Sequence, residues 1–280
     1  MEILNKNTIE KYIVPYLLKG KRGFKSKIPV TAVVCAILYR LKTGCQWRQL
    51  PLKEFFEDTS VSWNTVFYHF NRWSKTGCWE RVWLNLLKAH RSELNLSSLQ
   101  LDGSHTPAKN GGDATGYQGR KACKTTNALF ICDNQGIMMA ISTPQAGQHH
   151  DLFEIKELFG QLLKLLKEAE IDLDGLFLNA DSGFDSKNLK QICDEENIIA
   201  NIKTNPRNAS NKNIEPHTDG DHIFDDELYK ARYVIERSNA WLDAFKALLV
   251  RFEFTVRNWK ALHFIAFAVL FLRKIAKKKV

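Results

Sequence analysis

The chain has 280 residues, of which 44% are hydrophobic and 25% charged. This is ordinary globular composition, which excludes collagen-like, low-complexity and disordered chains. The length suits one large domain or two smaller ones and can bury a core without disulfide or zinc cross-links. The net charge of +9 lies in the first third, because residues 1–100 carry 16 basic and 7 acidic side chains and the remainder carries 24 of each. This asymmetry indicates an N-terminal part that contacts a polyanion, or else a basic surface without a partner.

The six cysteines and the apolar segments indicate where the chain resides. No two cysteines form a C-x-x-C pair or have His at zinc-finger spacing, and no signal peptide begins the chain. We therefore expect reduced thiols in a cytoplasmic protein. The longest apolar run, Ala261–Leu272, is shorter than the roughly 20 residues that a membrane span needs, so we expect a buried helix and no membrane contact.

The first 95 residues have the pattern of a helical domain. A helix is predicted over Val30–Lys42, ending at Thr43-Gly44, and a second over Ser60–Trp73, with Ser62 as its N-cap. The break at 75–77 precedes a third helix that opens at Trp79. Two helices joined by a short turn are typical of a helix-turn-helix-like DNA-binding domain, with Arg72 and Lys75 as DNA contacts. The alternative is that the tryptophans simply pack in a core.

From residue 96 onward the pattern predicts an α/β domain, 96–280, with a mixed β-sheet flanked by helices. Three strands come first, followed by helix–strand crossovers. A polar loop is expected over 205–221, and the chain from Asp225 to its end is predicted to be helical. The predicted strands are 98–102, 127–132, 137–142, 175–181 and 198–203, and the predicted helices are 151–170 and 186–197.

Two predicted strands end in a carboxylate followed by small turn residues. These are Asp102-Gly103-Ser104 and Asp181-Ser182-Gly183. Ligands of open α/β sheets collect at the carboxyl ends of strands, so neighbouring strands would direct both carboxylates into one site. A divalent cation offsets the repulsion between them, and oxygen ligands favour Mg²⁺ or Mn²⁺. A turn or capping role for each aspartate is the alternative.

A third polar group lies in the predicted C-terminal helix. Tyr229, Arg232 and Glu236 are three, four and seven residues apart, which places a phenol, a guanidinium and a carboxylate on one helix face. On spacing alone, Arg232 and Glu236 could equally form an ordinary surface ion pair.

Ordered sequence blocks resemble bacterial insertion-sequence transposases of the DDE class, in the group around insertion sequences four and five. TGCQWRQLP and NRWSKTGCWERVW are similar to the N-terminal domain of that group. LDGSH, NADSGFD and YKARYVIERSNAWLDAFKALLVRFE are similar to its three catalytic blocks, and the last carries its Tyr-x2-Arg-x3-Glu signature. One departure is Asp243, which stands where the group often has Lys; Lys246 lies one helical step further on the same face.

The resemblance implies an RNase H-like fold with Asp102, Asp181 and Glu236 as a catalytic triad. These carboxylates would bind two Mg²⁺ ions, with Mn²⁺ as a possible replacement, for cleavage at the element ends and attack of the freed 3′-OH on target DNA. The expected partners are the terminal inverted repeats, target DNA and further copies in a homodimer or larger assembly. The alternatives are a metal-dependent nuclease that does not join strands and an inactive DNA-binding copy.

Further residues are assigned to DNA contact or to support of the metal site. A solvated basic loop is the alternative for Lys109, Arg120 and Lys121, loop structure for His105, and a helix N-cap for Asp151. The expected DNA contacts are Tyr229, Arg232, Lys246, Lys109, Arg120, Lys121 and Lys124, and the supporting residues are His105, His149, His150 and Asp151.

Overall fold

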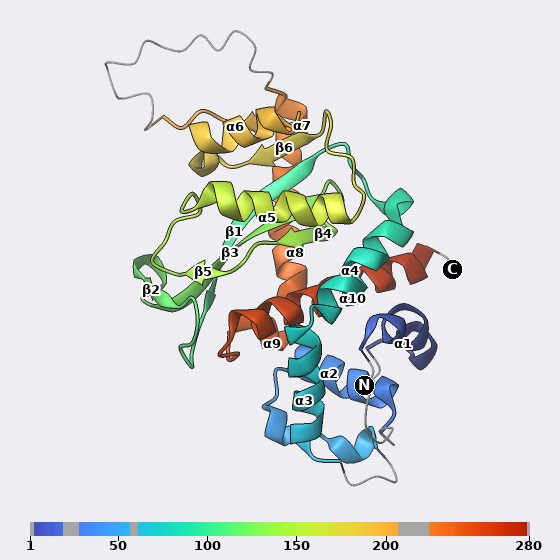
Figure 1. The fold of residues 1–280 in the computed structure, drawn as a ribbon. Coiled ribbons are helices and arrows are strands. Elements are labelled where there is room, and N and C mark those ends of the chain that lie inside the picture. Colours follow the sequence, from blue (N-terminus) through green and yellow to red (C-terminus); the bar gives the residue numbers. More distant parts are fainter. Residues whose placement is uncertain (1–2, 19–27, 57–60, 207–223, 279–280) are drawn as a thin grey trace.

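The computed structural model describes residues 3–18, 28–56, 61–206 and 224–278, in which helices surround one mixed β-sheet (Figure 1). The polar loop predicted at 205–221 lies almost entirely outside these residues. The helices are α1 (Lys6–Tyr12), α2 (Val30–Thr43), α3 (Trp63–Lys75), α4 (Cys78–Ala89), α5 (Ile155–Glu168), α6 (Lys187–Glu195), α7 (Asp226–Lys230), α8 (Val234–Asp243), α9 (Lys246–Leu249) and α10 (Val256–Lys278). The strands are β1 (Leu99–Pro107), β2 (Gly116–Gln118), β3 (Cys123–Asp133), β4 (Met138–Ile141), β5 (Gln145–Ala146), β6 (Phe177–Ala180) and β7 (Ile199–Ile202).

The N-terminal helices form where the sequence predicts them. Helix α2 ends at Gly44, whose φ of +69° is the left-handed conformation that terminates many helices. Helix α3 follows Ser62, and Gly77, also left-handed, separates it from α4. Trp73 and Trp79 are fully buried and pack edge to face. These two tryptophans therefore belong to the core, as the alternative interpretation of that segment expected.

The sheet contains every predicted strand and two short additional ones, β2 and β5. Its order is β2-β3-β1-β6-β7, with β4 and β5 also paired to β3. Strand β1 is antiparallel to β3, whereas β1, β6 and β7 are parallel. The prediction that the first strand ends at Asp102 is wrong, because β1 continues along β3 until Pro107 pairs with Thr125. The mixed sheet flanked by helices is confirmed.

The two faces of the sheet are covered by different helices, with α5 on one side and α8 on the other (Figure 1). Helix α5 begins at Ile155, four residues later than predicted, after Glu154 in a left-handed conformation. Asp151 is therefore not the N-cap of this helix, and the prediction of that capping role is wrong. Its carboxylate instead accepts a hydrogen bond from the Asn127 side chain at 2.7 Å.

The C-terminal region is helical, but not continuously. The chain is non-helical between α9 and α10, so the prediction of an unbroken helix from Asp225 is wrong. Helix α10 is buried as predicted for 261–272, and its Phe267 packs on Trp83 of α4 and Phe130 of β3. The C-terminal helix thus joins the N-terminal helices to the sheet in one hydrophobic core. Within the described residues, no helix is long and apolar enough to cross a membrane.

Candidate active site

A ladder of buried amide side chains crosses the three parallel strands. Gln100, Asn179 and Asn201 occupy paired positions on β1, β6 and β7 and are fully buried. Asn179 donates to Gln100 Oε1 at 3.0 Å, and Asn201 donates to Asn179 Oδ1 at 2.7 Å. Buried polar groups are stable only when they are hydrogen-bonded, so this amide ladder fixes the register of the three strands.

The amide ladder also determines where the two aspartates lie. Asp102 follows Gln100 by two residues, and Asp181 follows Asn179 by two, so each aspartate faces the same side of the sheet as its amide. Strand β6 ends at Ala180, but Asp181 is still extended, with φ −70° and ψ 168°. The pairing of Gln100 with Asn179 therefore brings Asp102 and Asp181 to the same level on neighbouring strands.

The same ladder attaches the helices that carry the third sequence block. Asn179 donates to the backbone oxygen of Leu228 at 2.8 Å, and Asn201 donates to that of Asp225 at 2.9 Å. Asp225 in turn caps α7 by accepting hydrogen bonds from two backbone N–H groups. Residues 226–243 then continue through α7, a 3₁₀ turn and α8 onto the face to which Asp102 points. No local sequence pattern predicts the amide ladder, although an amide stands two residues before each aspartate.

Asp102 has a strongly perturbed carboxyl group. Burial, with further contributions from the charges of Asp151 and Asp181, raises its pKa to about 7, and the nearby Arg232 offsets part of this effect. The side-chain nitrogen of Asn239 on α8 lies 3.5 Å from Asp102 Oδ2. The site thus concentrates negative charge that the protein itself only partly compensates, which is the condition in which a carboxylate binds a cation.

Glu236 lies on the same helix as Asn239, but its carboxylate is paired with Arg232 and exposed to solvent. Its side chain is 64% exposed, and an oxygen lies 3.7 Å from Arg232, the surface pairing that the spacing also allowed. In this arrangement, none of the described residues forms a cluster of three or more His, Cys, Asp or Glu side chains that could hold a metal ion.

The carboxylates nevertheless fit a divalent cation in their donor chemistry. Asp102 and Asp181 offer hard oxygen ligands from neighbouring strands, and positive charge would relieve the repulsion that raises the pKa of Asp102. Glu236 is one turn of α8 from Asn239, which reaches Asp102, so the two side chains lie on one face of that helix.

Two of the predicted supporting residues, Asp151 and His105, lie on the opposite face of β1 from Asp102, and the other two have local partners. A Cβ atom on Gly103 would stand 2.1 Å from Asp151 Oδ1, so only glycine allows Asp151 to lie against the strand next to Asp102. His105 contacts Thr125 through Nδ1 at 3.2 Å, and burial lowers its pKa. His149 stacks on Phe153 with ring centroids 3.6 Å apart. His150 Nδ1 accepts the backbone N–H of Leu152.

The predicted DNA contacts of the third block lie on exposed or half-buried surface near the carboxylates. Tyr229 packs against Phe224, and Lys203 Nζ lies 4.9 Å from its ring centroid. Lys246 is exposed at the start of α9, where its backbone approaches Gly44 of the N-terminal region. Asp243, at the position where the resemblance expects Lys, is close to both Lys121 and Lys246, and burial raises its pKa.

The predicted DNA contacts outside the third block lie in four separate places, one of which is Lys124 near the start of β3. They are largely solvent-accessible, as a phosphate contact requires. Lys109 lies beyond the end of β1, Arg120 and Lys121 lie in the turn after β2, and Arg72 and Lys75 lie in the last turn of α3.

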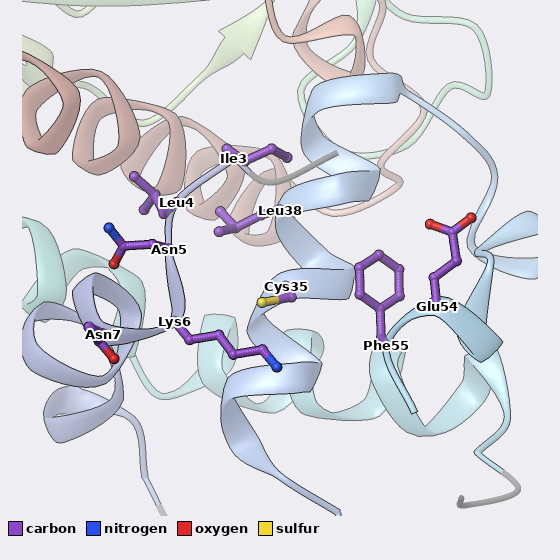
Figure 2. A pocket seen from close by; sticks show the side chains of 9 residues that line it. All are labelled: Ile3, Leu4, Asn5, Lys6, Asn7, Cys35, Leu38, Glu54 and Phe55. Atoms are coloured by element: carbon purple, nitrogen blue, oxygen red, sulfur yellow. The ribbon is translucent and has the colours of Figure 1, made fainter. Parts of the chain in front are cut away.

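A separate pocket of about 500 Å³ opens among the N-terminal helices (Figure 2). None of the predicted site residues lines it, and it is therefore not a part of the carboxylate site. Its lining is formed by Ile3, Leu4, Asn5, Lys6, Asn7, Cys35, Leu38, Glu54 and Phe55.

Two solved structures to which the chain is similar are complexes of the Mos1 transposase. One, the Mos1 transposase paired-end complex with left transposon end, is 10% identical, covers 92% of this chain and 82% of that chain, and has a TM-score of 0.28. Another, the Mos1 mariner paired end complex with Mn, is 12% identical, covers 97% and 85% of the two chains, and has a TM-score of 0.29. No curated protein matches the chain.

Comparison with protein families is decisive. Residues 8–83 match the family described as a putative transposase of the IS4/5 family, and residues 97–271 match the transposase DDE domain. The second match spans more than half of the chain and includes all three sequence blocks that carry the predicted triad. The chain therefore belongs to the DDE transposases of the IS4/5 group, metal-dependent DNA transposases with an RNase H-like catalytic fold.

Proposed function

We propose that this protein cleaves DNA at the terminal inverted repeats of its element and joins the freed 3′-OH to target DNA in one active site. Asp102, Asp181 and Glu236 would together hold two divalent ions, Mg²⁺ or Mn²⁺. When bound, such ions neutralise phosphodiester charge and increase the acidity of an attacking hydroxyl. The alignment of Asp102 with Asp181 on one face of the sheet is the observation that carries this proposal.

The surrounding residues support a binding step that precedes chemistry. Asp102 must lose its proton to act as a ligand, and its pKa of about 7 places that event near neutral pH. Glu236 must turn from Arg232 toward the aspartates, which frees the guanidinium for a phosphate. Tyr229, Lys246, Lys109, Arg120, Lys121, Arg72 and Lys75 are proposed as further DNA contacts.

The residues on the far face of β1 are proposed to support the site indirectly. Asp151 lies against Gly103 and is held by Asn127, so its charge acts on Asp102 through the strand. The three histidines would stabilise this side of the site or contact DNA beside it; they are His105, His149 and His150. We also propose that residues 1–95 form the DNA-binding domain and residues 96–280 the catalytic domain. Because two element ends must be held together, the active form would be a homodimer or a larger assembly.

An assay on labelled duplex tests this function. The duplex carries the terminal repeat that flanks the gene, and Mg²⁺ is present. We expect cleaved and joined products from the wild type and neither product from Asp181→Ala. Asp174→Ala is the matched control, because Asp174 is exposed in the turn before β6. Cleavage without joining would indicate a nuclease, and specific binding without cleavage, also with Mn²⁺, would indicate an inactive DNA-binding copy.

A further inference from the structure

The segment between α9 and α10 (Figure 1) buries charged side chains and exposes apolar ones. Arg251 and Glu253 are buried, whereas Phe252 is 49% exposed and Phe254 is 63% exposed. Folding normally buries phenylalanine and leaves charged groups in water, so exposed aromatic rings beside buried charges indicate a surface that contacts a partner. We call Phe252 and Phe254 the aromatic ridge.

The aromatic ridge is held by its buried neighbours. Arg251 donates to Thr126 Oγ1 at 3.1 Å and to two backbone oxygens of its own segment. Glu253 forms a buried ion pair with Arg40 of α2 at 2.7 Å. The inward-pointing side chains of the segment, Arg251 and Glu253, are engaged in these contacts, and the two phenylalanine rings point outward.

A loop that follows β1 fixes the backbone of the ridge from the other side. The side chain of Asn110 donates to the backbone oxygen of Phe252, and the N–H of Asp113 donates to that of Phe254. A Cβ atom on Gly112 would stand 2.2 Å from the Phe254 oxygen, so this close approach requires glycine. The rings are thus presented on a rigid support, which lowers the entropic cost of inserting them into a partner.

The charges around the aromatic ridge favour a polyanion. The adjoining segment 108–124 contains four cations and a single acidic residue, Asp113. A second copy packed across a two-fold axis would place this positive surface against itself, which is unfavourable. DNA has the complementary charge. The exposed cations are Lys109, Arg120, Lys121 and Lys124, together with Arg257 at the start of α10.

We propose that the aromatic ridge inserts into bound duplex DNA and unstacks a base step close to the cleaved bond. Apolar side chains inserted between base pairs unstack and kink the duplex in this way. Arg251 is hydrogen-bonded to the backbone oxygen of Pro107, five residues along β1 from Asp102, which is about 17 Å of strand. For a duplex that lies along β1, this distance corresponds to about five base steps. The inference rests on the proposed function only for the position of the cleaved bond.

Base unstacking is measured with 2-aminopurine placed singly along a duplex that carries the terminal repeat and its flanking DNA. Binding is followed in EDTA, so that no strand is cut. We expect increased fluorescence at about five base steps from the cleavage position and no increase with F252A/F254A. The double variant is also expected to bind the paired duplex roughly 5- to 150-fold more weakly, the range for a lost base–aromatic contact.

Three comparisons make the result specific. A duplex that already has a mismatch at the responding step should restore most of the affinity of F252A/F254A, because unstacking no longer has to be driven by the protein. F254W should retain the fluorescence increase. Trp241→Ala is the matched control, since Trp241 is also exposed but lies against Gly136, beyond the other end of β3.

Two outcomes would overturn the proposal. The first is an unchanged fluorescence response in F252A/F254A, and the second is loss of self-association by that variant, which would assign the ridge to a contact between copies. Asp181→Ala separates this test from that of the proposed function. The Asp181→Ala variant should keep the fluorescence response while losing cleavage. A folded F252A/F254A variant that binds DNA as tightly as the wild type would contradict the role of the aromatic ridge and leave the cleavage proposal intact.

Discussion

Asn201 donates a 2.7 Å hydrogen bond to Asn179, and both side chains are completely buried in neighbouring parallel strands. Through this contact, strand β6, which Asp181 follows, and the segment that leads into the third sequence block share one hydrogen-bond network. The position of α7 and α8 relative to the aspartates therefore depends on these buried amides.

Replacing Asn179 tests this dependence. Asn179→Ala leaves Gln100 Oε1 and the backbone oxygen of Leu228 without this donor, and each buried group that loses its partner costs roughly 1–3 kcal/mol. Urea unfolding should show that decrease in the free energy of unfolding. Asn85→Ala, which removes an exposed contact to Arg81 O, should change it by less than about 0.5 kcal/mol. Equal effects of the two substitutions would contradict the role of the ladder.

The perturbed carboxyl of Asp102 predicts a pH-dependent gain in stability for Asp102→Asn. Folding raises this pKa from 3.8 to about 7, so the proton stabilises the native state at low pH and that contribution is lost as the pH rises through 7. Because asparagine does not ionise, its advantage over the wild type should grow between about pH 4 and 7 and then level off. Thermal melts without divalent cations measure it, and a pH-independent difference would contradict the assignment.

The same experiment with added Mg²⁺ examines the metal. At pH 8 the cation should raise the melting temperature of the wild type, because it binds the native carboxylates and not the unfolded chain. The increase should be much smaller for Asp102→Asn. An equal increase in both proteins would place the stabilising cation elsewhere.

The buried ion pair between Arg40 and Glu253 predicts a large stability loss when one partner is removed. Glu253→Gln leaves the Arg40 guanidinium buried without its counter-charge, which typically costs about 3–5 kcal/mol. Glu168→Gln is the control, because Glu168 forms an exposed pair with Lys164 worth at most about 0.5 kcal/mol. Chemical unfolding of the two variants compares them directly, and a cost below 1 kcal/mol for Glu253→Gln would count against the pair.

Two glycine substitutions should have opposite effects on stability. Gly44→Ala forces a side chain into a left-handed residue and brings its Cβ to 3.0 Å from the Lys246 backbone, so we expect a loss of at least about 1–2 kcal/mol. Gly160 lies within α5 with nothing near its missing Cβ, and Gly160→Ala should stabilise by about 0.5–1 kcal/mol. Stabilisation by both substitutions would show that Gly44 is not constrained.

Much of this protein could be predicted from local sequence patterns. Apolar periodicity predicts α2 and the buried part of α10, Gly44 and Gly77 predict helix boundaries, and the three catalytic blocks identify the family. These features depend on neighbouring residues or on motifs, so no knowledge of the distant chain is needed to interpret them. The two aspartates could be singled out for the same reason, since each directly follows a short run of mostly apolar residues in the sequence.

The tertiary structure decided the rest, because those features depend on pairing between distant segments. Strand β1 continues past Asp102 only because β3 supplies hydrogen bonds as far as Thr125. Asp151 is hydrogen-bonded to Asn127 and does not cap α5. Arg251 and Glu253 are buried because Thr126 and Arg40 supply their partners. The sequence alone therefore determined the family and which residues are proposed to carry the chemistry. The long-range hydrogen bonds and ion pairs, whose partners no local pattern specifies, determined how those residues face one another.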